Sequence, residues 1–264
     1  MNFLQKIIAR KLEDSLKLFE SGVAESFKAA IAQRPAPLSL KAALDDKAGP
    51  AIIAEVKRAS PSKGEFAMHW DPVALAQIYQ DNGAAAVSVL TEPHYFKGEP
   101  DFIRRMRPVI DIPILRKDFI LEPIQVYETA ALGADALLLI VSLLEVGQLR
   151  ALMLLTRSLG LEALVEVHTA AEMATALSVG ARLIGINSRN LHTFEMFPDR
   201  ALELAPLAPP DATLVAASGL KTRHDLERYL AAGIRAFLIG ESLVIQADPG
   251  AALQELIGKK VNSY

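Results

Sequence analysis

Short apolar segments recur at a nearly constant interval along most of this chain. Each segment has four to six residues, and a longer stretch with helical spacing of its apolar residues follows it. The segments are AIIAEV (51–56), AAVSVL (85–90), IPIL (112–115), DALLLI (135–140), EALVEV (162–167), RLIGI (182–186), TLVAA (213–217) and RAFLI (235–239). From Ala51 to Arg235 they recur about every 26 residues, which is the length of one strand, one helix and two short loops.

The junctions between these segments repeat as well. Four amphipathic stretches end in a glycine just before an apolar segment, where a helix C-cap needs positive φ: Gly83, Gly133, Gly180 and Gly233. Helices are predicted to begin at Asp71-Pro72, at Glu122-Pro123 and at Thr222, which has an acidic residue three positions later as in a capping box. The pattern therefore indicates eight successive strand–helix units.

This repeat predicts an α/β fold, a (β/α)8 or TIM barrel. Near-continuous apolar strands are covered on both faces and therefore parallel, and eight regular units favour closure of the sheet. An open doubly wound sheet is the alternative, but it usually carries a GxGxxG loop after its first strand. Here KRASPSKG follows that strand. We expect residues 1–264 to form one barrel domain.

An N-terminal helical extension, residues 1–50, is predicted to precede the barrel. The apolar residues Phe3, Leu4, Ile7, Ile8, Leu12 and Leu16 recur at helical spacing, and a second short helix is expected over 25–32. We expect both helices to close the bottom of the barrel or to pack on its flank.

Composition excludes several function classes. The 264 residues are 51% hydrophobic and carry a net charge of −3, so no basic excess points to nucleic acid or to an anionic membrane as partner. The absence of cysteine excludes disulfides, thiolate catalysis and cysteine-bound metal centres. The longest apolar stretch, 136–144, is too short to span a bilayer, and the N-terminus lacks the apolar core of a signal peptide. We expect a cytoplasmic protein.

Charged and polar side chains stand where the predicted strands end. In barrels of this kind the active site lies at the C-terminal ends of the strands, and burying charge there requires partners. The strand-end residues are Glu55, Lys57, Ser60, Lys117, Glu166, Asn187, Arg189, Ser218, Gly219, Gly240 and Glu241. A set of Glu and Lys suits general acid–base catalysis. A structural ion pair between Glu55 and Lys57, and a solvated Lys117, are the alternatives.

Two further patterns concern ligands. The turns after the seventh and eighth strands are where such barrels commonly bind phosphate, through backbone N–H groups of Ser218, Gly219, Gly240 and Glu241. The five histidines show neither HxH nor HExxH spacing, so no metal site is expected. Phe96, in the loop after the second strand, could pack in the core or stack on a flat substrate.

The ordered strand-end segments resemble the indole-3-glycerol phosphate synthase family over essentially the whole chain. They are IIAEVKRASPSKG, SVLTEPHYFKG, PILRKDFI, LVEVH, IGINSRNL, ASGL and LIGESLV. The resemblance implies a carbon–carbon lyase (carboxy-lyase) of tryptophan biosynthesis. Such an enzyme closes the pyrrole ring of 1-(2-carboxyphenylamino)-1-deoxyribulose 5-phosphate with loss of CO2 and water. It implies no cofactor and a phosphorylated small molecule as partner. The sequence is compatible with a monomer but does not determine the oligomeric state.

The resemblance also implies roles for single residues. Lys117 would be the general acid, Glu166 the base in dehydration, and Lys57 the group that holds the substrate carboxylate. Glu55 would orient the lysines, with Asn187 and Arg189 beside it. The implied substrate-binding residues are Ser60, Ser218, Gly219, Gly240 and Glu241 for anions, mainly phosphate, and Phe96, Phe119, Leu138 and Leu191 for the aromatic ring.

One position departs from the family pattern. Ala217 stands where the family usually carries a glutamate before Ser-Gly, and Ser188 stands where asparagine is commoner. This departure keeps an alternative open, a weakly active or non-catalytic paralogue that binds the same phosphorylated ligand. A phosphoribosylanthranilate isomerase is disfavoured because that enzyme is expected to use a Cys/Asp pair, and this chain has no cysteine.

Overall fold

Eight parallel strands close into one barrel in the computed structural model, which describes residues 3–60, 63–66, 71–191 and 193–259. Pro61 and Ser62 of the KRASPSKG segment lie outside the described residues. The barrel strands are β1 (Ala51–Val56), β4 (Ala86–Leu90), β5 (Ile114–Lys117), β6 (Ala136–Ile140), β7 (Glu162–Val167), β8 (Leu183–Asn187), β9 (Thr213–Ala217) and β10 (Ala236–Ile239). Each pairs with its neighbours, and β1 closes the sheet between β10 and β4. The predicted (β/α)8 barrel is confirmed.

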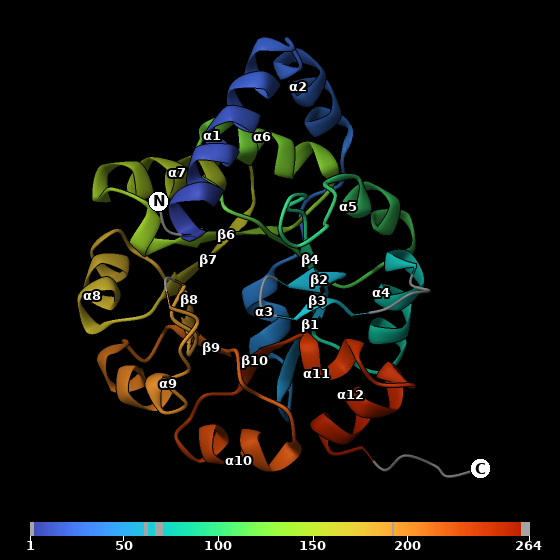
Figure 1. Ribbon diagram of the computed structural model, residues 1–264, viewed down its shortest axis with the longest axis vertical. Coiled ribbons are helices and arrows are strands. Elements are labelled where there is room, and N and C mark those ends of the chain that lie inside the picture. Colours follow the sequence, from blue (N-terminus) through green and yellow to red (C-terminus); the bar gives the residue numbers. More distant parts are fainter. Residues whose placement is uncertain (1–2, 61–62, 67–70, 192, 260–264) are drawn as a thin grey trace.

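Helices surround the barrel in sequence order (Figure 1). They are α4 (Pro72–Asp81), α5 (Asp101–Met106), α6 (Pro123–Leu132), α7 (Val146–Ser158), α8 (Ala170–Ser178), α9 (Arg200–Leu204), α10 (Arg223–Ala231), α11 (Glu241–Val244) and α12 (Pro249–Ile257). The predicted helix starts are confirmed: Asp71 accepts from the Val73 N–H, and Glu122 and Thr222 both form capping boxes. All four predicted C-terminal glycines have positive φ.

Side chains alternate between the two faces of each strand, so the core has two parts. Outward residues such as Ile52 and Val87 pack against the helices, while inward residues such as Ile53, Leu115 and Leu164 fill the barrel. Because side chains alternate between the two faces, each strand ends in a predictable inward position. The barrel interior is therefore apolar for most of its length, and only its last inward layer can carry chemistry.

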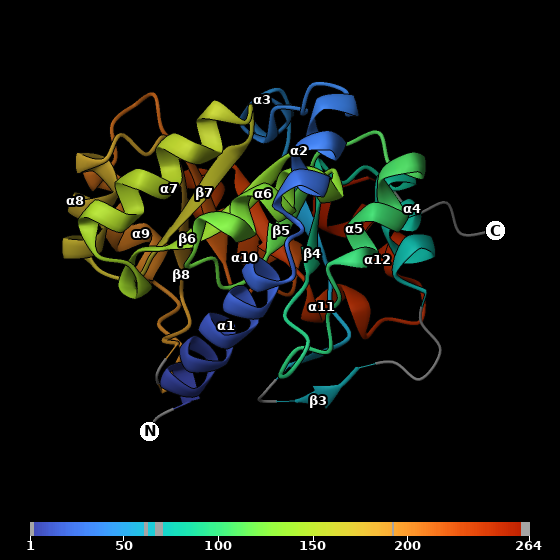
Figure 2. The same ribbon diagram turned by 90° about the horizontal axis from the view of Figure 1, so that it is seen from above.

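The N-terminal extension contains one helix more than predicted. Helices α1 (Phe3–Glu20) and α2 (Ala24–Gln33) match the expectation, while α3 (Leu40–Asp45) was missed because six residues are too few for a periodic signal. Figure 2 shows α3 at one end of the barrel, and α11, β3 (Gly64–Glu65) and the start of α1 at the other. Leu40 and Leu44 of α3 are buried against the inward residues of the barrel.

The two longer N-terminal helices therefore have different positions. Helix α2 packs on α6, on the flank as expected. Helix α1 also contacts α6, but its Lys11 reaches the mouth of the barrel, which is the end where the strands finish. There Lys11 Nζ lies 2.9 Å from Asp118 Oδ1, just after β5. Of the two placements expected for α1, the structure shows packing on the flank, and α3 closes the bottom of the barrel instead. A further short pair, β2 (Ala59–Ser60) with β3, lies beyond the end of β1.

Candidate active site

The last inward positions of the strands form a charged layer at the mouth of the barrel. Glu55 follows Ile53 on β1, Lys117 follows Leu115 on β5, and Glu166 follows Leu164 on β7, each two residues along the strand. Asn187 and Ala217, paired in register, end β8 and β9. The strand period places these side chains on the inner face together.

A cavity of about 590 Å³ opens above this layer. All fifteen residues named from the sequence line it: Glu55, Lys57, Ser60, Phe96, Lys117, Phe119, Leu138, Glu166, Asn187, Arg189, Leu191, Ser218, Gly219, Gly240 and Glu241. Lys63, Phe194 and Lys221 also line it and were not predicted, because their positions depend on how the loops fold back.

Two ion pairs line the cavity. Lys57 Nζ lies 2.9 Å from Glu55 Oε1, and Lys117 Nζ lies 3.9 Å from Glu166 Oε2. Burial raises the pKa of Glu55, but the ammonium groups of Lys57 and Lys117 outweigh burial, so its pKa lies below the ordinary value. Glu55 is therefore a carboxylate at neutral pH and can hold both lysines by charge.

Glycine at position 240 is required by this arrangement. A Cβ placed there would lie 2.6 Å from Glu55 Oε1 and 3.0 Å from its Cβ. No side chain other than hydrogen leaves Glu55 in place. Gly240 thus positions the first ion pair directly, in addition to beginning the turn into α11.

Glu166 is held mainly through one of its two oxygens. Asn187 Nδ2 donates to Glu166 Oε1 at 3.1 Å, and Asn187 Oδ1 accepts from the Arg189 backbone N–H at 3.0 Å. The other oxygen, Oε2, faces Lys117 beyond hydrogen-bond distance. A carboxylate fixed on one side and open on the other is suited to accept a proton from a bound molecule.

One wall of the cavity is apolar and aromatic. The rings of Phe96 and Phe119 have centroids 6.2 Å apart, and both pack in the same cluster as Leu138 and Leu191. Glu92 fixes the Phe96 loop, since its carboxylate accepts the backbone N–H groups of Tyr95 and Phe96 at 2.7 and 3.0 Å. This wall fits the flat face of an aromatic ring.

The opposite side of the cavity is suited to an anion. Ser218 and Gly219 both have positive φ, which turns the chain sharply after β9, and Gly240 precedes the first turn of α11. The first N–H groups of a helix lack partners within it. Ser60 Oγ is buried, lines the cavity and forms no hydrogen bond within the described chain. These donors can converge on a phosphate.

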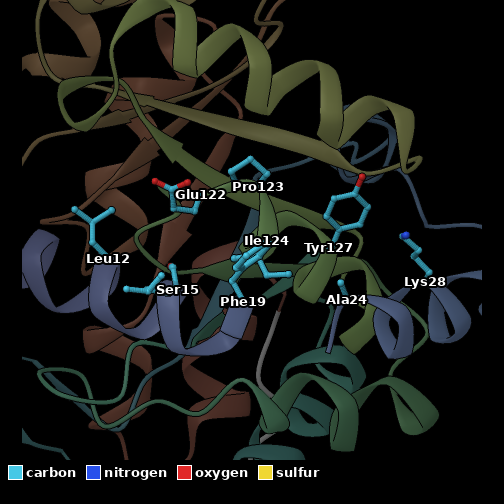
Figure 3. A pocket seen from close by; sticks show the side chains of 10 residues that line it. Leu12, Ser15, Phe19, Ala24, Lys28, Glu122, Pro123, Ile124 and Tyr127 are labelled. Atoms are coloured by element: carbon cyan, nitrogen blue, oxygen red, sulfur yellow. The ribbon is translucent and has the colours of Figure 1, made fainter. Parts of the chain in front are cut away.

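A second cavity, of about 510 Å³, lies between α1, α2 and α6 (Figure 3). Leu12, Phe19, Ile124 and Tyr127 line it, with Ser15 as a buried hydroxyl. It lacks the facing acid–base pairs of the first cavity, so the mouth of the barrel is the candidate active site. Among the described residues, no group of three His, Asp or Glu side chains could hold a metal ion, and no helix is long and apolar enough to cross a bilayer.

Comparison with known proteins shows the family of this chain. A family model described as indole-3-glycerol phosphate synthase matches residues 4–256. The indole-3-glycerol phosphate synthase of Carboxydothermus hydrogenoformans is 49% identical over 225 residues, covering 84% of this chain and 85% of that protein. That of Chlorobium chlorochromatii is 42% identical over 250 residues, covering 94% and 97%.

Solved structures show the same fold at much lower identity. The 3-hexulose-6-phosphate synthase from Salmonella typhimurium superposes with a TM-score of 0.63 at 11% identity, covering 78% of this chain and 96% of that one. The thiamine phosphate pyrophosphorylase from Pyrococcus furiosus superposes with a TM-score of 0.58 at 15% identity, covering 83% and 96%. These likenesses concern the barrel alone. With a family model over nearly its whole length and relatives this similar, the chain belongs to the indole-3-glycerol phosphate synthase family.

Proposed function

We propose that this chain converts 1-(2-carboxyphenylamino)-1-deoxyribulose 5-phosphate into indole-3-glycerol phosphate, with loss of CO2 and water. This makes it a carbon–carbon lyase of the carboxy-lyase class, acting in tryptophan biosynthesis on a phosphorylated small molecule. The observation that carries the proposal is the facing pair of Lys117 and Glu166, whose Nζ and Oε2 lie 3.9 Å apart inside the cavity. The named relatives favour this reaction over a paralogue that only binds the ligand.

The substrate has three parts, and the cavity offers a place for each. The aromatic ring would lie against the wall of Phe96, Phe119, Leu138 and Leu191. The phosphate would accept hydrogen bonds from Ser60, Ser218 and the backbone N–H groups of Gly219, Gly240 and Glu241. The carboxylate on the ring would pair with Lys57, which Glu55 orients. Binding at three separate points places the ring carbon beside the ribulose carbonyl.

Ring closure requires an acid. The ring carbon that bears the carboxylate attacks the ketone carbon of the ribulose chain, and the ketone oxygen gains negative charge as the bond forms. Lys117 would donate a proton to that oxygen, giving a hydroxyl group. The carbon–carbon bond to the carboxylate then breaks, CO2 leaves, and its electron pair restores aromaticity in the ring. Lys57, after holding that carboxylate, could serve as a second acid.

Dehydration requires an acid and a base. The hydroxyl formed in the first stage leaves as water when it is protonated, and a proton is lost from the adjacent carbon to complete the pyrrole ring. Glu166 would accept that proton through Oε2, the oxygen that faces Lys117, because Asn187 holds Oε1. Glu166 can return that proton to the acid that protonates the leaving hydroxyl, whereas Lys117 regains from solvent the proton it gave in ring closure, because loss of CO2 from a carboxylate consumes one proton overall. Arg189, whose backbone N–H fixes Asn187, completes this polar side.

The direct test is turnover of the chemically prepared substrate. The purified chain is mixed with 1-(2-carboxyphenylamino)-1-deoxyribulose 5-phosphate while indole fluorescence and CO2 release are followed together. We expect both to rise with equal stoichiometry, and a Lys117→Ala preparation of the same melting temperature to show neither at a comparable rate. Binding of the substrate in calorimetry without fluorescence or CO2 would contradict the proposal and favour the non-catalytic paralogue. The cytoplasmic location and the single-domain organisation stay predictions.

A further inference from the structure

His168 lies between two carboxylates just beyond the end of β7. Its Nε2 is 3.6 Å from Glu166 Oε1, and its Nδ1 is 3.3 Å from Glu172 Oε2. The same Glu172 oxygen accepts the His168 backbone N–H at 2.7 Å. Glu172 itself is placed by the first turn of α8, where its backbone N–H donates to the N-cap Thr169. Glu172 therefore holds His168 by its backbone and by Nδ1, and the other ring nitrogen is turned toward Glu166.

The imidazolium form satisfies this arrangement better than the neutral ring. With Nδ1–H donating to Glu172, a neutral ring would present a lone pair to the Glu166 carboxylate, whereas the charged ring presents an N–H group to each carboxylate. The Nε2 contact with Glu166 is an ion-pair contact at 3.6 Å, longer than a hydrogen bond. The side chain is only 13% exposed, and burial lowers its pKa, but Glu172 and Glu166 outweigh burial and the opposing charge of Lys117. The pKa of His168 therefore lies above its ordinary value.

The charged groups that face the imidazole in the described chain come from three elements. They are Glu166 on β7, Glu172 on α8 and Lys117 on β5, while Asn187 on β8 is the neutral partner of the same Glu166 oxygen. Glu166 Oε1 is thus approached by Asn187 and His168, and Oε2 by Lys117. The two oxygens of this carboxylate have separate surroundings.

We propose that His168, anchored by Glu172, is a positioning residue that holds Glu166 Oε1 and so keeps Oε2 turned toward Lys117 and the substrate. The proposal rests on the proposed function, in which Glu166 accepts the proton of the dehydration step. His168 acts on substrate only through Glu166. In its charged form it also places a positive charge 3.6 Å from Glu166 Oε1.

The sign of the pH effect follows from these contacts. Below the pKa of His168 the ring carries a positive charge beside Glu166 Oε1, and as pH rises through that pKa this charge is lost and Oε1 is held, among the described residues, by Asn187 alone. The turnover number should therefore fall along a basic limb that lies above the ordinary imidazole value of about 6.5. The same protonation contributes stability that is present below the unfolded-state pKa and is lost as pH rises through the folded-state pKa.

Two variants distinguish a positioning role of His168 from a role in packing alone. His168→Gln replaces the ring with an amide that does not titrate, so the histidine limb should disappear. Because the positive charge beside Glu166 is also lost, kcat should fall about tenfold while KM stays unchanged. Glu172→Gln keeps an acceptor for Nδ1–H but removes its charge, so the limb should move to lower pH. A basic limb due to another acid of the site would remain in all three proteins. A packing role alone would lower the melting temperature of both variants and leave the profile unchanged, which would overturn the proposal.

A second measurement does not depend on turnover. The imidazole of His168 is titrated by proton–nitrogen NMR, its signal assigned by its loss in His168→Gln. We expect a pKa above the ordinary value that falls in Glu166→Gln, where the facing charge is removed. If the wild-type chain makes no product but this titration behaves as expected, the proposed reaction is contradicted while the contact between His168 and Glu166 is supported. If the pKa of His168 is the same in the wild-type chain and in Glu166→Gln, His168 does not hold Glu166. The inference then fails even if the enzyme is active.

Discussion

The two ends of the barrel each bury carboxylates, but the carboxylates are bonded differently. Asp135, just before β6 at the α3 end, accepts the backbone N–H groups of Leu38 and Ile114 at 2.9 and 2.8 Å and the Arg107 guanidinium at 2.6 Å. Glu166, at the mouth, is equally buried. One of its oxygens is bonded to Asn187, and the other faces a cavity with Lys117 3.9 Å away.

This difference shows what marks a functional group in a barrel. Burial and charge are the same at both ends, so neither identifies a catalytic residue. The oxygens of a structural carboxylate accept all their hydrogen bonds from the protein. A functional carboxylate keeps an oxygen that faces a cavity and can still accept one. Changes at the mouth should therefore affect turnover with little effect on stability, and changes at the α3 end should do the reverse.

The largest expected effect is at Lys117. Lys117→Ala removes the proposed acid, so kcat should fall by about 10²–10⁴-fold, with KM changed much less. The matched control is Lys41→Ala, which removes a lysine paired with Asp45 near the α3 end and should leave kcat unchanged. Steady-state kinetics on both proteins checks this. A Lys117→Ala enzyme with near-normal kcat would mean that another group is the acid.

The next effect concerns stability at the opposite end. Asp135→Asn leaves the Arg107 and Arg34 guanidiniums without their buried counter-charge, which should lower the free energy of unfolding by about 3 kcal/mol. Urea unfolding measures this loss. The folded variant should keep the wild-type kcat at 25 °C. A large drop in kcat at unchanged stability would remove the distinction between the two ends.

A smaller effect is expected from anion binding at the mouth. Phosphate at 100 times its dissociation constant should stabilise the chain by about 2.7 kcal/mol, seen as a rise in melting temperature. Gly219→Leu should abolish that rise, since position 219 has φ of +79° and a Cβ there would lie 2.7 Å from Met196 Cε. Gly147→Leu in α7 is the control, because its Cβ meets nothing within 4 Å. An equal rise in both variants would place the anion site elsewhere.

The smallest effect is expected at Ala217. Ala217→Glu adds a carboxylate beside Asn187, where the family resemblance leads us to expect one, and kcat should rise by less than about tenfold with KM nearly constant. Ala217→Gln tests whether the rise in kcat needs the negative charge of the glutamate. If the glutamate lowers both kcat and the melting temperature, it is an unpaired buried charge and the alanine is already compensated.

Periodicity predicted most of this fold because every barrel unit repeats one pattern. The bounds of β1, β7 and β9 match the apolar segments, whereas β5 lies two residues later than IPIL. The apolar segment ends at Leu115, but the next side chain, Arg116, is buried in an ion-pair cluster with Asp118 and Glu128 and continues the strand. A charged residue inside a strand cannot be recognised as buried until its partners are known.

The sequence placed the strand-end side chains correctly because alternation and the parallel sheet bring them to one end. It could not place groups whose position depends on distant contacts. Lys11 reaches Asp118 across 107 residues of sequence, which sets α1 at the mouth. The orientation of His168 depends on Glu172, four residues on in the next helix. Neither contact leaves a periodic signal.

One strand allows the central claim to be tested with a matched pair. Glu166 and Glu162 both belong to β7, but Glu162 lies at the α3 end, where it accepts the Ser39 hydroxyl and the Lys41 backbone N–H, each at 2.8 Å. We would measure kcat and the melting temperature of Glu166→Gln and Glu162→Gln. The account predicts at least about a 10²-fold loss of kcat with little change in melting temperature for Glu166→Gln. It predicts normal kcat with a lowered melting temperature for Glu162→Gln. A Glu166→Gln enzyme that turns over normally, or equal losses of kcat in the two variants, would contradict it.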